Sequence, residues 1–363
     1  MFQNFKLRRG LTTISLGAML AGCGGSFPLS APGASVGAVP QARAHQLPER
    51  SWMAPTASWQ DLLYVSEGGE NVYVYTYPQG HLVGTLTGFI YALGECVDSA
   101  GDVFIVTQTN SSSSSSVIFE YAHGGTQPIA TLKDPTGGEG CAINPTSGDL
   151  AVAGGYMSGS SAYGDVAIYP DAQGSPSMYY SSTFLPFHLC GYDAKSDLYV
   201  SATDFYSGVE ELLVRLSARS SVFEQVTLNV TLYAVDPFPS SVQWDGSYMT
   251  VSSASQGVGG GTDGPAYLYR LRISGSTATV VGTTTLSSRK NRLKSGQIRI
   301  EDRRVLGADY SGKASGGVDS WSYPNAAKAR TVVPHTVNLS PFGVAVSPAV
   351  SRRGTFSLQG FLR

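Results

Sequence analysis

The stretch Pro341-Phe342-Gly343-Val344-Ala345-Val346-Ser347-Pro348 lies near the end of a chain of 363 residues. Its short apolar run between turn residues predicts an inner β-strand. Residues 349–363 repeat nothing seen earlier, so the strands that complete its sheet must come from elsewhere in the chain. The strand-like residues 61–65 begin a unit that has no inner strand of its own. We therefore expect the end of the domain to pair with its beginning and to close a ring.

A repeat connects these two ends. One polar residue ends each expected inner strand, and successive members lie 46 to 56 residues apart: Asp98, Asn144, Asp193, Asp245, Glu301 and Ser347. This period is typical of propeller repeats. A short turn and a second apolar strand follow most of these residues, which is the sequence form of a hairpin. A third strand, often ending in Tyr, and a weaker fourth complete each unit, as in a propeller blade.

The count gives six inner strands and six second strands, and the second strands start one unit earlier. The sequence therefore predicts an all-β, six-bladed β-propeller in which residues 61–87 and 342–347 share one blade. Seven blades is the alternative, because residues 49–59 and 349–363 are unassigned. The pattern in residues 94–106 and 342–348 resembles the propellers of the NHL and SMP-30/gluconolactonase kind. The resemblance covers most of residues 61–349.

The first residues indicate where the protein resides. Basic residues precede a short apolar stretch, residues 11–20, which leads into Leu20-Ala21-Gly22-Cys23. This resembles the lipobox of bacterial lipoproteins, which implies that residues 1–22 are a signal peptide and that Cys23 carries a lipid. An ordinary secretory signal is the alternative. The lipoprotein resemblance predicts a cell-envelope protein outside the cytoplasm, in the outer membrane if the organism is Gram-negative, since Gly24 follows Cys23.

The rest of the chain divides into a tether and a domain. Residues 23–48 are rich in Gly, Ala, Pro and Ser, which predicts a disordered tether. Residues 49–363 would form the propeller. The formal net charge is -2 and 14% of the residues are charged. This balance is not strongly basic, so nucleic acid is not favoured as a partner. The expected contacts are the membrane, through the lipid, and an unknown protein, glycan or small ligand; we expect a monomer.

Residues that begin inner strands surround one mouth of a propeller channel. The repeat places Glu95, Glu139 and His188 there, and carboxylates with a histidine could bind Ca²⁺ or act as acid and base. The alternative is that they cap strand ends or bind channel water. No cofactor other than this Ca²⁺ is expected.

The resemblance to SMP-30-like lactonases bears on the same mouth. Residues 136–140 are similar to the first metal-ligand segment of that family, and Asp204 lies at a place similar to its catalytic Asp. The Pro-Asn-Gly of the family appears here as Pro341-Phe342-Gly343, and Phe cannot bind a metal. We therefore favour a binding or interaction module over an enzyme. The alternative is a divergent lactonase, hydrolase or lyase that uses Glu95, Glu139, His188 and Asp204.

Three cysteines lie on successive expected inner strands. Cys141 and Cys190 stand three residues before their polar residues, whereas Cys96 stands two before its own. Because side chains alternate along a strand, Cys141 and Cys190 should share one face and Cys96 should point the other way. A disulfide between Cys141 and Cys190 is then the candidate in an oxidising compartment. The alternative is three small buried hydrophobic residues between blades.

Overall fold

The computed structural model describes residues 50–109, 115–158, 161–203, 210–234, 240–254, 265–287, 296–312, 315–325, 328–337 and 339–349. These residues belong to one compact unit, Leu47–Arg363. The predicted signal peptide (1–22), the lipid-bearing Cys23 and the tether (23–48) lie outside the described residues. Within them the secondary structure is β-strand, with two short 3-10 helices, η1 (Pro55–Trp59) and η2 (Pro170–Ala172). Neither helix has the length and apolar character needed to span a membrane.

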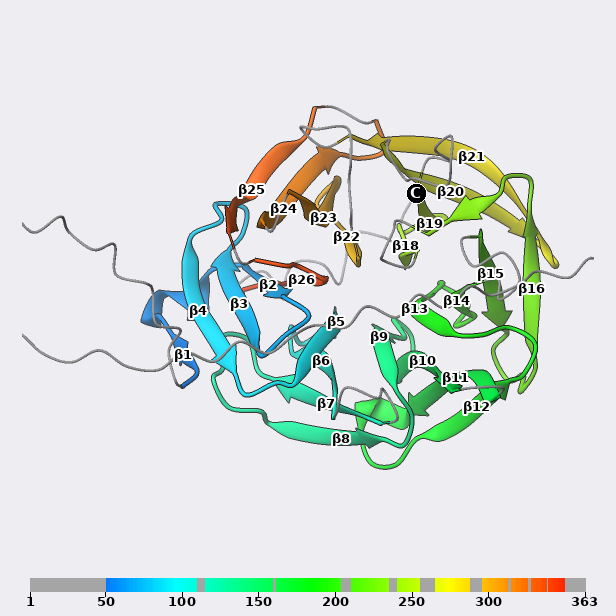
Figure 1. Ribbon diagram of the computed structural model, residues 1–363, viewed down its shortest axis with the longest axis horizontal. Helices are drawn as coiled ribbons and strands as arrows, with labels where there is room; N and C mark the ends of the chain where they lie inside the picture. Colours follow the sequence, from blue (N-terminus) through cyan, green and yellow to red (C-terminus); the bar gives the residue numbers. More distant parts are fainter. Residues whose placement is uncertain are drawn as a thin grey trace, which may run out of the picture. The chain divides into compact units, whose positions relative to one another are not determined.

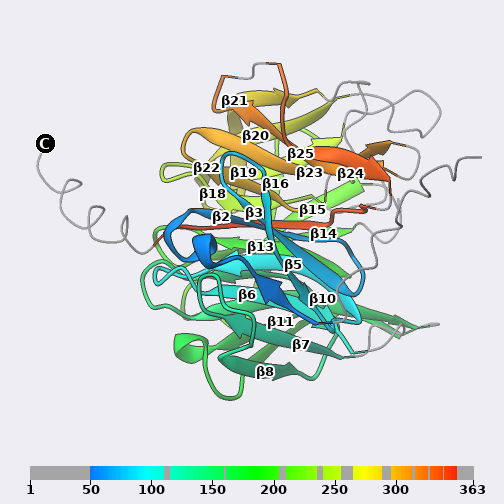
Figure 2. The same ribbon diagram turned by 90° about the vertical axis from the view of Figure 1, so that its left-hand side faces the viewer.

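The described strands form five hydrogen-bonded sheets arranged around a central axis in a propeller-like manner (Figure 1). The sheet that joins the two ends of the domain contains β1 (Trp52–Met53), β4 (Leu82–Thr87), β3 (Asn71–Thr76), β2 (Leu62–Ser66) and β26 (Gly343–Ser347), in that order. Figures 1 and 2 both show β26, in red, beside the blue β2. The expected pairing of the two ends is therefore confirmed.

Three further sheets each contain four antiparallel strands. The first has β5 (Tyr91–Val97), β6 (Val103–Gln108), β7 (Ser116–Tyr121) and β8 (Ala130–Asp134). The second has β9 (Gly138–Ile143), β10 (Leu150–Ser158), β11 (Ser161–Tyr169) and β12 (Ser177–Ser181). The third has β22 (Ile298–Glu301), β23 (Arg304–Gly312), β24 (Ser315–Ser322) and β25 (Arg330–Val337). In each, the first strand lies nearest the axis (Figure 1).

The remaining sheet has nine strands. One antiparallel group contains β13 (Phe187–Tyr192), β14 (Leu198–Thr203), β15 (Glu210–Leu216) and β16 (Phe223–Leu228), with β17 (Leu232–Tyr233) pairing to β15. The other contains β18 (Val242–Trp244), β19 (Met249–Ala254), β20 (Ala266–Ser274) and β21 (Thr277–Leu286). Among the described strands, the pairing that makes the two groups one sheet is parallel, between β16 and β21, over two residue pairs.

Hydrophobic clusters fill the space between neighbouring strand groups. Strand β2 is an example of this packing, because all five of its residues are buried. Leu62 and Tyr64 pack towards β6, whereas Leu63 and Val65 pack towards β23 and β24. A strand covered on both faces reads as a continuous apolar run rather than as an alternation. Each strand group is thus held by contacts on both of its faces.

The predicted polar residues mark the ends of the inner strands because of the turns that follow them. Asp98, Asn144, Asp193 and Asp245 each follow the last residue of an inner strand. In each case Oδ1 accepts a backbone N–H two to four residues further along the chain. Asp and Asn are favoured at such positions because their short side chains stabilise the turn. The repeat in the sequence is therefore a repeat of hairpin turns.

The closing strand fits against its neighbours only because it begins with glycine. A Cβ on Gly343 would lie 2.4 Å from Leu93 O and 2.5 Å from Ser66 Oγ. Gly343 N–H donates to Ser66 Oγ (2.8 Å), and Ser66 Oγ–H donates to Leu93 O. The start of β26 is therefore held against both β2 and β5.

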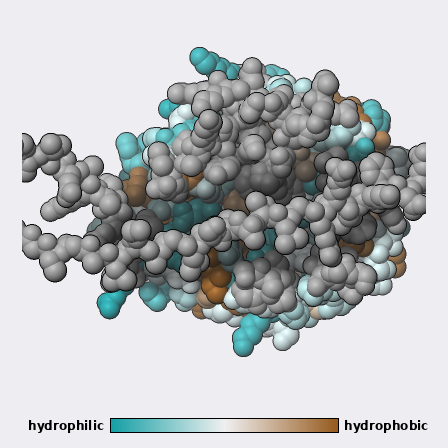
Figure 3. Space-filling model, viewed as in Figure 1, coloured by the Kyte–Doolittle hydropathy of each residue, from teal (hydrophilic) through white to brown (hydrophobic). Residues whose placement is uncertain are grey.

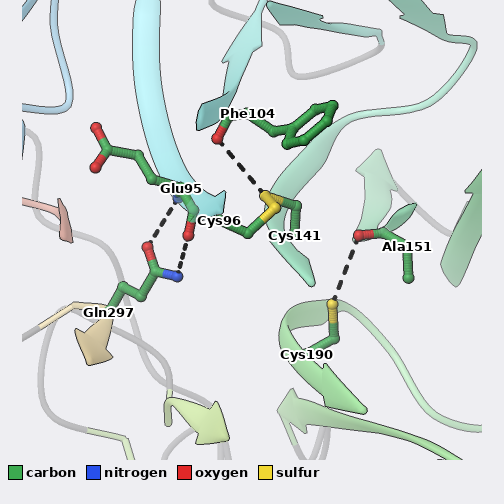
Figure 4. The surroundings of a disulfide bond; sticks show 7 residues. All are labelled: Glu95, Cys96, Phe104, Cys141, Ala151, Cys190 and Gln297. Atoms are coloured by element: carbon green, nitrogen blue, oxygen red, sulfur yellow. Dashed lines mark hydrogen bonds between the residues drawn. A yellow bond between two sulfur atoms is a disulfide. The ribbon is translucent and has the colours of Figure 1, made fainter. Parts of the chain in front are cut away.

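The expected Cys141–Cys190 disulfide is wrong. Cys96 and Cys141 form a disulfide with a Cα–Cα distance of 5.7 Å, and Cys190 is a buried free thiol (Figure 4). The expected directions are correct: Cys141 Sγ lies 3.8 Å from Phe104 O and Cys190 Sγ lies 3.9 Å from Ala151 O, each in the preceding sheet. Where two neighbouring sheets meet, one contributes its front face and the other its back face. A disulfide between neighbouring sheets therefore needs one cysteine that points forward and one that points back, as Cys96 and Cys141 do.

The position that could pair with Cys190 is occupied by alanine. Ala142 stands two residues before Asn144, as Cys96 stands two before Asp98. Ala142 pairs with Ala151 in the same way that Cys96 pairs with Phe104. Cys190 therefore faces a site where the sequence supplies no second thiol.

We predict that alkylation of the denatured, unreduced protein labels Cys190 within the propeller, and that Cys96 and Cys141 are labelled only after reduction. The disulfide closes a loop with a sequence separation of 45 residues. In the chain-entropy account this stabilises the fold by about 4 kcal/mol. Cys96→Ala should therefore lower the free energy of unfolding far more than Cys190→Ala. Peptide mass spectrometry that found a Cys141–Cys190 cross-link would contradict the assignment.

Candidate functional site

The inner strands β5, β9, β13, β18, β22 and β26 surround the central axis (Figure 1). We call the end where these strands begin the entry end, and the end where they finish the exit end. The predicted mouth residues belong to the entry end. Glu95, Glu139 and His188 lie in β5, β9 and β13. Asp204 lies outside the described residues.

Glu139 and His188 are brought together. His188 Nδ1 lies 2.8 Å from Glu139 Oε2, and His188 Nε2 lies 2.8 Å from the hydroxyl of Thr203, which ends β14. The His188 side chain is 13% exposed and that of Glu139 is 29% exposed. The three side chains form a hydrogen-bonded chain across two neighbouring sheets. We call Glu139, His188, Thr203 and the nearby Glu211 the entry cluster.

The charge state of His188 follows from this setting. Burial alone would lower the pKa of His188, but the hydrogen bond and negative charge of Glu139, with the charge of Glu211, raise it to about 8. His188 is therefore mainly an imidazolium at neutral pH, and both ring nitrogens donate: Nδ1 to Glu139 and Nε2 to Thr203. A histidine in this state can donate a proton or stabilise an anion, whereas it is a poor base.

Glu211 belongs to the same cluster but was not predicted from the sequence. It lies on the third strand of its group, β15, and is 5% exposed. Its Oε2 accepts the N–H of Ser240 (3.1 Å), and burial raises its pKa. Glu211 does not begin an inner strand, so the repeat gave no reason to expect it at the mouth. Glu211 on β15 pairs with Thr203, the last residue of β14. The sequence feature that could have revealed Glu211 is therefore an acidic residue at the start of a third strand, opposite the end of the second.

Glu95 is set apart from the entry cluster. Its side chain is 1% exposed, and among the described residues neither carboxylate oxygen has a hydrogen-bond partner. Burial raises the pKa of this carboxyl well above its ordinary value. Its backbone is held instead: Glu95 N–H donates to Gln297 Oε1 (2.8 Å), and Gln297 Nε2 donates to Glu95 O (2.6 Å) (Figure 4).

Gln243 makes the same pair of hydrogen bonds to the backbone of Ile300 on the neighbouring inner strand. Gln243 Oε1 accepts Ile300 N–H (2.8 Å), and Gln243 Nε2 donates to Ile300 O (3.4 Å). The side-chain amides of Gln297 and Gln243 thus each pair with the backbone N–H and C=O of one residue, as the backbone of a neighbouring strand would. Gln297 and Gln243 therefore hold the inner strands in position.

Towards the exit end the channel widens into a cavity of about 800 Å³. Residues from the last parts of β5, β9, β13, β18 and β22 line its wall, together with the turns that follow. The wall combines the aromatic residues Tyr192 and Trp244 with polar groups such as Arg299 and Gln173. This volume lies within the range of small-molecule sites.

A row of tyrosines crosses the sheet that contains β9. The rings of Tyr156 and Tyr163 are stacked at 5.7 Å, and Tyr180 meets Tyr163 edge-on at 5.7 Å. Tyr180 is 56% exposed. Beside them Thr136 donates to Asp165 (2.7 Å), and burial, with the charge of Asp134, raises the pKa of Asp165 to about 7.

No protein-family model matches the sequence, and no curated protein matches it. Among solved structures, a protein of unknown function from Bacteroides caccae is similar with a TM-score of 0.52 and 10% identity, over 80% of this chain and 99% of that chain. TolB from Acinetobacter baumannii is similar with a TM-score of 0.55 and 10% identity, over 81% of this chain and 68% of that chain. Likeness at this identity shows the fold, a β-propeller, and not the activity.

We predict that His188 makes stability depend on pH. The pKa of His188 is higher in the folded state (about 8) than its ordinary value of 6.5, so the contribution of His188 to stability is present below about pH 6.5 and is lost as the pH rises through 8. The difference corresponds to about 2 kcal/mol. Urea unfolding of the wild type and of His188→Gln at pH 6 and pH 9 measures it.

The wild type should lose about 2 kcal/mol more than His188→Gln over this interval. Asp165 titrates in the same interval in both proteins, so the comparison removes its effect. Parallel pH profiles for the two proteins would show that His188 is not held as an imidazolium.

Proposed function

We propose that the protein is a six-bladed β-propeller, anchored outside the cytoplasm by a lipid on Cys23, that binds a small polar ligand in its channel. Counting the nine-stranded sheet as two blades gives six, because among the described residues the strand pairing between its halves is limited to two parallel residue pairs. Six hydrophobic clusters between successive strand groups support the same count.

Two features support the location outside the cytoplasm. The sequence Leu20-Ala21-Gly22-Cys23 follows a basic and an apolar segment, as in lipoproteins. The Cys96–Cys141 disulfide suits an oxidising compartment such as the periplasm or the cell surface. In a Gram-negative organism, Gly24 after Cys23 favours the outer membrane.

The cavity at the exit end carries the proposal of a binding function. Its volume of about 800 Å³ is enough for a small molecule. Trp244 and Tyr192 offer ring surfaces, whereas Gln173, Arg299 and exposed turn backbone offer hydrogen-bond donors and acceptors. Rings combined with polar groups suit a ligand with many hydroxyl groups, such as a sugar.

The charges of the wall narrow the ligand class. Four acidic residues line the cavity, Glu95, Asp98, Glu120 and Asp171, against one basic residue, Arg299. Even without Glu95, whose pKa burial raises, three acidic residues face one basic residue, which leaves the wall with an excess of negative charge. A strongly anionic ligand is therefore disfavoured, and a neutral or cationic one is favoured.

The described residues on the face shown in Figure 3 have mixed polarity. There, small hydrophobic patches lie among hydrophilic residues.

We predict that a neutral sugar or oligosaccharide raises the melting temperature and changes the fluorescence of Trp244. Trp244→Ala and Arg299→Ala should each weaken binding by about tenfold or more, since a lost aromatic or charged contact is worth one to a few kcal/mol. Titration calorimetry with a panel of neutral, cationic and anionic sugars measures this.

Arg215→Ala is the matched control. Arg299 pairs with Glu301 (3.2 Å). Arg215 likewise pairs with Glu224 (2.8 Å), but this pair lies on β15 and β16, outside the cavity. This variant should bind as the wild type does. Equal weakening by Arg215→Ala and Arg299→Ala, or no binding by any member of the panel, would refute the proposed site.

The entry cluster supports a second candidate function, proton-donating catalysis by a divergent hydrolase or lyase. The observation that favours it is the hydrogen-bonded chain from Glu139 through His188 to Thr203. In this reading His188 is the acid and Glu139 holds it charged. Turnover of a lactone or glycoside substrate that is lost in both His188→Gln and Glu139→Gln would favour this function over simple binding.

A further inference from the structure

A second cluster of ionisable groups lies away from the channel, in the sheet formed by β22 to β25. Asp309 of β23, Asp319 of β24 and His335 of β25 each offer one ligand atom, and these atoms lie within 4.8 Å of one another. Both aspartates are 1% exposed, whereas the side chain of His335 is 26% exposed. The cluster is therefore buried on the aspartate side and open to solvent on the histidine side.

The strand register explains how the three side chains meet. Asp309 pairs with Gly317, and Asp319 pairs with Gly307, so the two aspartates are diagonal neighbours on one face of the sheet. On the other side of β24, Val318 pairs with Val333 but Gly316 pairs with Thr336, which leaves an extra residue in β25. Such a bulge redirects the side chains of the strand that carries it.

Glycine at position 317 leaves the space that His335 occupies. A Cβ on Gly317 would lie 2.6 Å from His335 Cδ2. Any larger residue would push the imidazole out of the gap between the aspartates. The bulge and this glycine together bring His335 Nε2 to 3.4 Å from Asp319 Oδ2 and 4.0 Å from Asp309 Oδ2.

These distances are longer than good N–H···O hydrogen bonds, which measure about 2.7 to 3.2 Å. Asp319 also interacts with Thr331 and Asp309, so its carboxylate lies among polar groups on several sides. Ligand atoms around a tetrahedral ion with bonds of about 2.0 to 2.1 Å lie about 3.4 Å apart. The shorter of the two distances matches this spacing, and the three ligand atoms lie within 4.8 Å of one another, so small side-chain movements would let all three bind one ion.

We propose that Asp309, Asp319 and His335 form a site for a divalent transition-metal ion, with Zn²⁺ as the representative. The ion would bind His335 Nε2 and one oxygen of each aspartate, and solvent on the histidine side would complete its coordination. Two carboxylates buried beside one histidine carry an excess of negative charge that such an ion neutralises.

The ligand set distinguishes the ion from the alkaline-earth metals. Ca²⁺ and Mg²⁺ take oxygen ligands, and a site with an imidazole nitrogen suits Zn²⁺, Mn²⁺ or Co²⁺. This site is separate from the Ca²⁺ site expected at the entry end, where Glu139 is hydrogen-bonded to His188. It is also independent of the proposed ligand cavity, since none of its residues lines that cavity.

The test uses the full-length protein extracted in detergent, freed of metal by a chelator and dialysed. One equivalent of Zn²⁺ should bind in titration calorimetry and raise the melting temperature, as an ion that binds the folded state must. Co²⁺ should bind at the same place and give a visible absorption spectrum. Ca²⁺ and Mg²⁺ should give neither effect at equal concentration.

His335→Gln and Asp319→Asn keep the side-chain size and remove a ligand atom or its charge. Each should weaken Zn²⁺ binding by about 100-fold or more, since loss of a group that merely orients a ligand already costs up to that much. Asp165→Asn is the matched control, because Asp165 is also a buried aspartate on the third strand of its sheet, β11. It should bind Zn²⁺ as the wild type does.

The effect of Zn²⁺ separates a metal site from a structural ion pair. If the cluster is a metal site, Zn²⁺ raises the melting temperature of the wild type and leaves that of Asp319→Asn and His335→Gln nearly unchanged. A large loss of stability in metal-free Asp319→Asn, with no effect of Zn²⁺ on the wild type, would overturn the proposal. Zn²⁺ binding that survives in both ligand variants but is lost in His188→Gln would overturn it too, by placing the ion at the entry cluster.

Discussion

The pairing of β26 with β2 is the interaction on which the rest of the structure depends. Five residue pairs, from Leu62↔Ser347 to Ser66↔Gly343, join the two ends of the domain. Val344 and Val346 of β26 pack with Leu63 and Val65 against the neighbouring sheet, so the strand contributes apolar burial as well as hydrogen bonds. Without β26, the polar backbone of β2 would face the interior unpaired, which is costly for buried groups.

The geometry of the channel follows from this closure. Gln297 N–H donates to Phe342 O just before β26, while the Gln297 side chain reaches past it to Glu95 on β5. The three inner strands β22, β26 and β5 are thereby fixed relative to one another at the entry end. The entry cluster and the cavity both lie on inner strands whose spacing this ring determines, so the proposed functions depend on a strand that contributes no residue to either.

The fold was largely predictable because its signals are local. Asp98, Asn144, Asp193 and Asp245 stabilise hairpin turns through bonds to residues at most four positions away, so their spacing appears directly in the sequence. The closing strand was predictable by counting. The disulfide was predicted wrongly, although the side-chain directions were right, because facing sheets present opposite faces to each other. Glu211 was missed because its position depends on pairing with Thr203 across two strands, and His335 was missed because its position depends on a bulge in β25. Neither feature produces a periodic pattern in the sequence.

The most direct test of the account is hydrogen exchange in β2 after removal of the closing strand. A chain that ends at Pro341 should lose protection of the amides in Leu62–Ser66 and melt at a much lower temperature, whereas a chain that ends at Val350 should behave as the full-length protein. Unchanged protection of β2 and an unchanged melt in the chain that ends at Pro341 would contradict closure by β26.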